Sequence, residues 1–169
     1  MGDTPSADKP LTDRLLRSWS RCRRRAWLDR HGDQSKRVYT AHRTLQLDDQ
    51  QRSFVALLPR KPGRGLAACE RGDDGVVGLR LRGRTDEGQS IEAHPALLQR
   101  QPGRSRWGDY VYRPVLARQG RRLTREHRLQ LALSARLLAS YQQAPVNAGL
   151  AVAGAGRHLE KNTVALGEN

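Results

Sequence analysis

Residues 107–138 most constrain the fold, because a strand pattern, a basic turn and a helix pattern follow one another within this stretch. Residues 110–118 alternate as the residues of a half-buried strand do. One side of the expected strand carries Val111, Val115 and Ala117, and the other carries Tyr110, Tyr112 and Leu116. Gly120 ends the pattern, so the sequence predicts a strand followed by a turn.

The helix pattern begins after this turn. Thr124 is suited to the N-cap position, because its hydroxyl can accept a hydrogen bond from the first turn of a helix. We expect the helix to end near Gln142. Its predicted apolar face consists of Leu129, Ala132, Leu133, Leu137 and Tyr141.

Arginines cluster between the strand and the helix, at Arg118, Arg121, Arg122, Arg125 and Arg128. Guanidinium groups this close in sequence repel one another unless they are solvated or paired with phosphates or carboxylates. The turn is therefore a candidate site for an anionic partner.

The charge of the whole chain points in the same direction. The 169 residues suit one domain with a core of its own, and the formal net charge is +14. Of the 31 basic residues, 27 are arginine and 4 are lysine. Arginine binds phosphate in a bidentate manner, which favours an anionic polymer as the partner. A GC-rich coding bias is an alternative reason for the ratio of arginine to lysine, but it does not explain the excess of positive charge.

Cys22 and Cys69 form no CxxC pair, so they predict neither a disulfide framework nor a complete four-ligand metal site. Residues 1–10 are polar and lack the apolar core of a signal peptide, and they are expected to be a disordered lead. The most apolar stretch, residues 129–141, is too short to span a membrane. These features predict a cytoplasmic protein with reduced, buried cysteines.

A helix is expected to follow Thr12, which can cap it, and to end at Gly32. Its apolar stripe is Leu11, Leu15, Trp19, Cys22 and Ala26, and its opposite face carries Arg14, Arg17, Arg21, Arg24 and Arg25. A second helix is expected to begin at Asp48 or Asp49, to bury Phe54, Val55 and Leu58, and to stop at Pro59.

The remaining pattern is short and mostly extended. Residues 65–71 could form two helical turns, residues 76–82 alternate as a strand, and residues 95–100 are expected to be a short strand. Residues 149–153 and 157–160 flank Gly154-Ala155-Gly156 as the two strands of a hairpin do. No pattern follows in residues 161–169, so a single domain is predicted over residues 11–160.

Two stretches carry a family resemblance. Residues 15–29 read LLRSWSRCRRRAWLD, with a cysteine followed by basic residues and an aromatic-Leu pair. The second stretch reads GDYVYRPVLARQGRR and is followed by EHRLQLALSARLL. The chain resembles the RecB-like nuclease domains of the PD-(D/E)XK superfamily, which are found in bacteria. The resemblance implies an α/β (α+β) fold with helices first, then a three-stranded sheet, a long helix and a final strand or hairpin.

The resemblance also implies a metal-dependent nuclease site, which needs oxygen ligands for Mg²⁺ and a lysine that positions or activates water. The Pro-Asp step of the family aligns with Pro95-Ala96, and Ala96 has no ligand atom. The acidic and lysine positions on the next strand align with Leu116 and Arg118, of which the first cannot bind a metal and the second is a poor substitute for lysine. Gln130 on the helix is the position that matches. The expected protein is a nuclease relative without its metal site and without a cofactor, in which Gln130 and Arg118 are vestigial catalytic positions.

An active, Mg²⁺-dependent DNA nuclease is the alternative, if carboxylates elsewhere have rebuilt the site. The acids close enough in sequence are Glu92, Asp109 and Glu126. Asp109 also suits a turn before a strand, and Glu126 suits the first turn of a helix, where its charge interacts favourably with the helix dipole.

The expected partner is nucleic acid, most simply DNA, which the protein would bind through its phosphates. No association with a membrane is expected. The candidate contacts are Arg21, Arg24, Arg25, Arg118, Arg121, Arg122, Arg125 and Arg128. A solvated charged face is the alternative reading of these residues. Trp107, Tyr110 and Tyr112 could stack on bases, although aromatic residues in a strand more often belong to the core. A protein-interaction module that binds no nucleic acid remains the other functional class.

Overall fold

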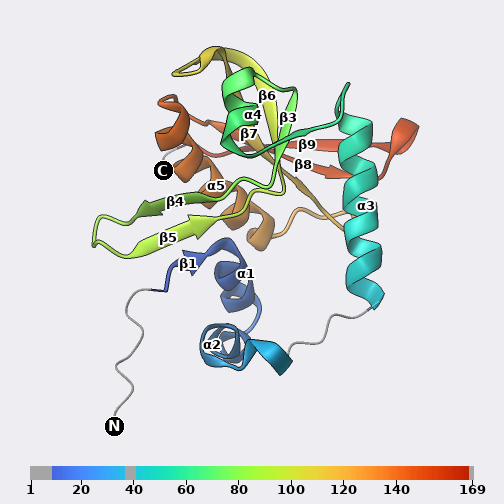
Figure 1. Cartoon of the computed structure of the whole chain (residues 1–169). Helices are drawn as coiled ribbons and strands as arrows, with labels where there is room; N and C mark the ends of the chain where they lie inside the picture. The colour runs from blue at the N-terminus through green and yellow to red at the C-terminus, as the bar shows by residue number, and fades with distance from the viewer. Residues whose placement is uncertain (1–8, 37–40, 168–169) are drawn as a thin grey trace.

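The computed structural model describes residues 9–36 and 41–167, so most of the expected disordered lead lies outside the described residues. The chain forms two mixed β-sheets with helices around them (Figure 1). The larger sheet has the strand order β2 (Gly63–Arg64), β3 (Gly75–Val77), β6 (Leu97–Ser105), β7 (Gly108–Ala117), β8 (Ala148–Ala153) and β9 (Glu160–Ala165). The smaller sheet has the order β1 (Leu11–Thr12), β5 (Ser90–Ala93) and β4 (Leu81–Arg84). The helices are α1 (Asp13–Arg21), α2 (Arg23–His31), α3 (Ala41–Leu57), α4 (Gly65–Arg71) and α5 (Arg125–Gln142), with 3₁₀ turns at Gln34–Lys36 and Gly156–His158. The fold is therefore mixed α/β, as predicted. None of the helices in the described part of the chain is both long and apolar enough to cross a bilayer.

The strand, turn and helix predicted from residues 107–138 are confirmed as β7, a turn and α5. β7 pairs in parallel with β8, and α5 is the crossover that a parallel pair requires. The Thr124 hydroxyl accepts a hydrogen bond from the His127 N–H at 3.4 Å, and His127 Nδ1 accepts one from the Thr124 N–H at 3.2 Å. This capping box fixes the start of α5 at the end of the basic turn.

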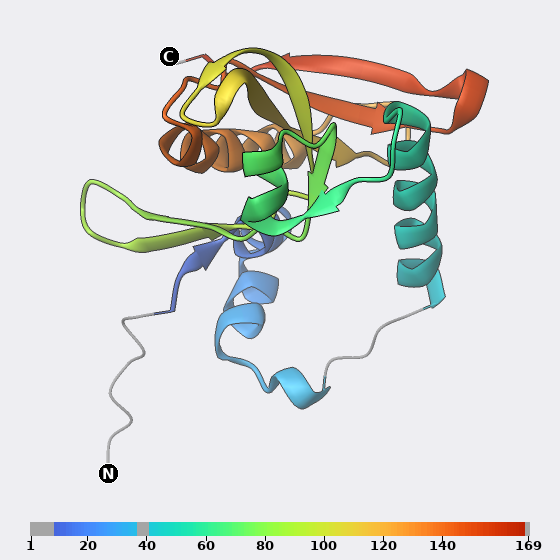
Figure 2. The same ribbon diagram turned by 45° about the horizontal axis from the view of Figure 1, so that its top comes forward.

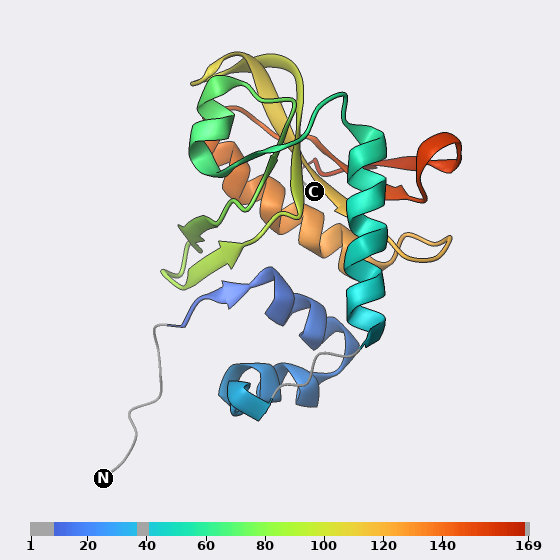
Figure 3. The same cartoon turned by 45° about the vertical axis from the view of Figure 1, so that its right-hand side comes forward.

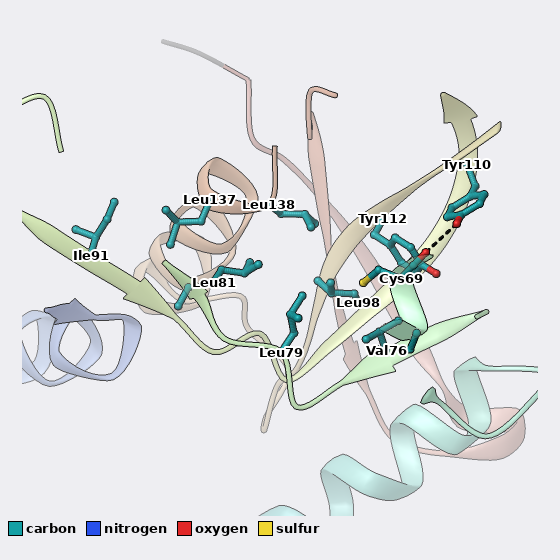
Figure 4. Packing of buried hydrophobic residues seen from close by; sticks show 12 residues of the cluster. Cys69, Val76, Leu79, Leu81, Ile91, Leu98, Tyr110, Tyr112, Leu137 and Leu138 are labelled. Carbon is teal, nitrogen blue, oxygen red and sulfur yellow. Dashed lines mark hydrogen bonds between the residues drawn. The ribbon is translucent and has the colours of Figure 1, made fainter. Parts of the chain in front are cut away.

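α5 lies between the two sheets and packs on strands of both (Figure 2). The predicted apolar face of this helix is wrong in part, because the helix buries two sides rather than one. Its buried residues are Leu131, Ser134, Ala135, Leu137, Leu138 and Gln142. Leu137 and Leu138 pack with Leu81, Ile91 and Tyr112 in the main core cluster (Figure 4).

The chain breaks the expected first helix in two. Cys22 has an extended backbone, with φ −160° and ψ 117°, and separates α1 from α2. The two helices then pack on each other, and the Ser18 hydroxyl donates a hydrogen bond to the Asp29 carboxylate. Cys22 is exposed, so the prediction of a buried cysteine is wrong at this position. In the expected apolar stripe Trp19 is also exposed, while Ala26 is buried.

The expected strand over residues 76–82 is also divided. Gly78 adopts a positive φ of 67°, and β3 and β4 on either side of it join different sheets. Before β7 the chain forms β5, which was not predicted. The short strand expected over residues 95–100 is β6, which continues through Pro102 to Ser105.

α3 begins at Ala41 rather than at Asp48 or Asp49, and it ends before Pro59 as expected. It buries Phe54 and Leu58 against β7 and β8, whereas Val55 is 61% exposed. α3 stands at the side of the molecule, across from α1 and α2 (Figure 3). α4 is confirmed at the predicted position.

The C-terminal hairpin is confirmed, but its second strand starts at Glu160 and continues to Ala165. The prediction that residues 161–169 have no pattern is wrong for this strand, and the domain predicted to end at residue 160 continues through β9. β9 is an edge strand on which Val164 is the buried residue, so its sequence shows no alternation.

Candidate nucleic-acid interface

An open cleft of about 1280 Å³ lies between α1 and α2 on one side and α3 on the other. Its remaining wall is formed where β7 ends and α5 begins, together with the end of β8. The Ser53 hydroxyl on α3 donates a hydrogen bond of 2.5 Å to the Gly154 carbonyl, and Gln46 donates one of 2.9 Å to Gln119. These contacts join α3 to the strand ends.

The side chains that line the cleft are strongly cationic. They include Arg14, Arg17, Arg21, Arg25, Arg43, Arg52 and Arg118, together with His42 and His127. Among the described residues of the lining, Asp49 is the one carboxylate. We call this region the arginine cleft.

Four of these seven arginines have carboxylate partners. The pairs are Arg14 with Asp29 at 3.6 Å, Arg21 with Glu126 at 2.7 Å, Arg118 with Glu160 at 2.5 Å, and Arg52 with Asp49. Within the described part of the chain, Arg17, Arg25 and Arg43 form no ion pair. The cleft therefore holds positive charge that the protein itself does not neutralise.

Arg17 carries the clearest electrostatic sign of this excess. Its pKa is lowered, first by burial and then by the positive charges of Arg43 and Arg21. Asp13 and Glu126 oppose this effect as smaller contributions. An anion bound between Arg17 and Arg43 would relieve the repulsion between their guanidinium groups.

Arg118 is buried and held by several acceptors. Its guanidinium donates to Glu160 Oε2 at 2.5 Å, to Asn162 Oδ1 at 3.0 and 3.2 Å, and to the carbonyl of Gly120. Its side chain is 3% exposed, so it ties the end of β7 to β9 and forms part of the cleft wall. This structural role explains an arginine at the position where the family resemblance implies a lysine.

The other positions implied by the resemblance lie in different surroundings. Ala96 packs against the cluster that contains Val115, and Leu116 belongs to a third cluster, next to Leu131. Gln130 donates a 3.5 Å hydrogen bond to Asp13, which is buried at the start of α1. Within residues 9–36 and 41–167, no hydrogen bond connects Gln130 with Arg118.

The three fallback carboxylates also have separate surroundings. Glu126 pairs with Arg21, and this hydrogen bond is the largest contribution that raises the pKa of Arg21. Glu92 is buried and accepts hydrogen bonds from Arg82 at 2.9 Å and contacts His94 at 2.8 Å. Asp109 is exposed near the start of β7. In residues 9–36 and 41–167, no group of three or more His, Cys, Asp and Glu side chains is arranged so that it could hold a metal ion.

The structure places three of the eight predicted contacts in the arginine cleft, namely Arg21, Arg25 and Arg118. The other five, Arg24, Arg121, Arg122, Arg125 and Arg128, are exposed outside its lining. The spacing of Arg14, Arg17 and Arg21 on one helix face was a signal for the α1 side of the cleft. His42, Arg43 and Arg52 were missed, because α3 was expected to begin after the first two of them.

Of the two possibilities for Tyr110 and Tyr112, the core position is confirmed, so their rings are not available to stack on bases. Both rings are buried, and their hydroxyls donate to the carbonyls of Cys69 and Asp73 at 2.8 and 2.7 Å. Burial raises the pKa of Tyr112 far above its usual range. Trp107 packs edge-on against Tyr112, with ring centroids 6.0 Å apart.

The arrangement is suited to bind a chain of phosphates, because guanidinium groups from three helices face one open cleft. No family model and no curated protein matches this chain. The functional argument therefore depends on the residues of the cleft.

Proposed function

We propose that this protein binds nucleic acid, most simply DNA, through the arginine cleft. The observation that carries the proposal is the group formed by Arg17, Arg25 and Arg43, which line one cleft without a carboxylate partner among the described residues. Phosphodiester oxygens are the natural partners of such a group, since each guanidinium can donate two parallel hydrogen bonds to one phosphate. Backbone contacts of this kind are independent of base sequence.

We also propose that the chain is a RecB-like domain of the PD-(D/E)XK type that has no catalytic activity. This proposal is supported by the order of the elements, in which antiparallel β6 and β7 precede the crossover helix α5 and the parallel strand β8. It is also supported by Ala96 and Leu116, whose apolar side chains occupy the positions that the resemblance assigns to metal ligands. In this account the protein holds nucleic acid in the cytoplasm and does not cut it.

The test is a fluorescence anisotropy titration with labelled DNA. The double variant Arg17→Ala/Arg43→Ala removes two cleft charges, and Arg104→Ala/Arg106→Ala removes two exposed charges outside the cleft. We expect the cleft variant to bind about tenfold more weakly near physiological salt, because two phosphate contacts are lost. The control variant should bind nearly as the wild type does.

Equal losses in the two variants would mean that binding depends on net charge alone and would contradict the cleft as the site. No binding by the wild type at low salt would overturn nucleic acid as the partner and leave the protein-interaction reading. The same samples are then incubated with Mg²⁺ and separated on a gel. Intact DNA is expected, whereas cleavage that Asp109→Asn or Glu126→Gln abolishes would establish the active nuclease instead.

A further inference from the structure

Two of the three tryptophans in the chain are exposed on the helices that carry one wall of the arginine cleft. Trp19 on α1 is 51% exposed and Trp27 on α2 is 60% exposed. Tryptophan is highly buried on average, so two exposed rings on neighbouring helices point to a contact with a partner.

Each ring has a flat cationic or imidazole group beside it. The guanidinium carbon of Arg23 lies 6.0 Å from the centroid of the Trp19 ring. The rings of Trp27 and His31 have centroids 5.3 Å apart and an interplanar angle of 34°. These neighbours restrict the orientation of the rings and leave much of each ring open to solvent.

The neighbours of Trp27 on its helix also favour a charged partner. The residues three and four positions before and after it are Arg23, Arg24, Arg30 and His31. A helix face that enters a lipid surface or packs on a second copy of the chain would carry apolar residues at these positions. Trp27 is instead an aromatic ring within a cationic surface, as in proteins that bind single-stranded nucleic acids.

The two helices place aromatic and phosphate-binding groups close together along the chain. Trp19 lies between Arg17 and Arg21 on α1, and Trp27 lies two residues after Arg25 on α2. Arg17, Arg21 and Arg25 all line the arginine cleft. Residues two apart lie on different faces of a helix, so the rings lie outside the cleft, on the helices that form its wall. A strand that runs out of the cleft across α1 and α2 can place unpaired bases on these rings.

We propose that Trp19 and Trp27 form a stacking site for unpaired bases and that they give this protein a preference for single-stranded nucleic acid. This inference rests on the proposed binding of nucleic acid by the cleft. Bases within a duplex are stacked on one another, so a duplex can use the cleft but not the rings. The single-strand preference comes from the tryptophans, while the arginines supply the affinity common to both forms.

The experiment uses the fluorescence of the two tryptophans themselves. The variant Trp107→Phe keeps Trp19 and Trp27 as its tryptophans. This variant is titrated with an oligothymidylate and with a duplex of equal length. We expect strong quenching by the oligothymidylate and little quenching by the duplex, because stacking on a base quenches the ring. Anisotropy on the wild-type background should show that Trp19→Ala and Trp27→Ala each weaken single-strand binding about 5- to 150-fold and leave duplex binding nearly unchanged. Trp27→Tyr should restore part of the loss.

The outcomes separate this inference from the cleft proposal. Equal binding of both forms that is unaffected by the tryptophan variants would overturn the stacking site and leave the cleft proposal intact. Binding of neither form would overturn both. A blue shift with anionic phosphatidylglycerol vesicles but no response to the oligothymidylate, or dimerisation abolished by Trp27→Ala, would assign the rings to a lipid or protein contact and overturn the inference. Both rings are exposed, so circular dichroism of the alanine variants should match that of the wild type.

Discussion

Replacing Arg118 by methionine should destabilise the protein by about 2–3 kcal/mol. The side chain is 3% exposed and donates to Glu160, Asn162 and the carbonyl of Gly120. Breaking a buried pair costs about 3–5 kcal/mol when the remaining charge stays buried. Glu160, Asn162 and Gly120 are exposed and their acceptors can return to water, so the cost falls to the range of about 1.5–3 kcal/mol that hydrogen bonds to a charged group contribute.

The assay is urea unfolding followed by circular dichroism, with Arg122→Met as the control for the loss of one exposed arginine. The control should change the free energy of unfolding by less than about 0.5 kcal/mol. For a chain of this length, the loss expected for Arg118→Met corresponds to a decrease in Tm of about 4–12 °C. The free energy of unfolding of Arg118→Lys should lie between those of Arg118→Met and the control, because one ammonium group cannot reach all the acceptors. If Arg118→Met is as stable as the control, the guanidinium does not tie β7 to β9 and the explanation of Arg118 as a structural residue is refuted.

Three further predictions concern Gln142, His127 and Cys69. Gln142→Met should cost about 1–3 kcal/mol in a urea titration, because Gln142 is fully buried and accepts the N–H of Tyr112 at 2.9 Å; an unchanged midpoint would refute this bond. Burial lowers the pKa of His127 below its ordinary value of 6.5, so the unfolded chain binds this proton more readily. The neutral imidazole therefore makes its full contribution to stability above pH 6.5, and this contribution is lost as the pH falls toward the folded pKa. The free energy of unfolding, measured from neutral to acidic pH, should decrease more steeply in the wild type than in His127→Gln. Parallel curves would contradict the lowered pKa. Burial raises the pKa of Cys69 to about 12, so a thiol reagent should modify Cys22 alone in the folded protein and both cysteines in denaturant; rapid modification of both in the folded protein would contradict this burial.

Local patterns were sufficient to predict some of these elements. The strand, turn and helix of β7 and α5 follow from alternation, a glycine and an N-cap threonine, all of which act between near neighbours in sequence. The break at Cys22 could not be predicted in this way, because the contact between Ser18 and Asp29 that accompanies it is tertiary. β9 was missed because its pairing with β8 buries Val164 and leaves the rest of the strand polar.

The candidate site could also be predicted only in part from the sequence. The arginines of α1 are visible in the sequence as one face of a helix, and Arg118 is visible as the residue after a strand. The contribution of α3 depends on where this helix stands relative to α1, which no local pattern encodes. The exposure of Trp19 could not be predicted because of the same break at Cys22, since an uninterrupted helix would have placed Trp19 in the apolar stripe.

The most direct test of the central claim is the salt dependence of single-strand binding in the wild type and in Arg17→Ala/Arg43→Ala. Each phosphate neutralised on a single strand contributes about 0.7 to the slope of log affinity against log salt concentration. The account predicts that the slope of the double variant is shallower than that of the wild type by about 1.4, whereas Arg104→Ala/Arg106→Ala leaves the slope unchanged. Identical slopes in the wild type and the cleft variant would show that Arg17 and Arg43 do not contact phosphates, and they would contradict the account.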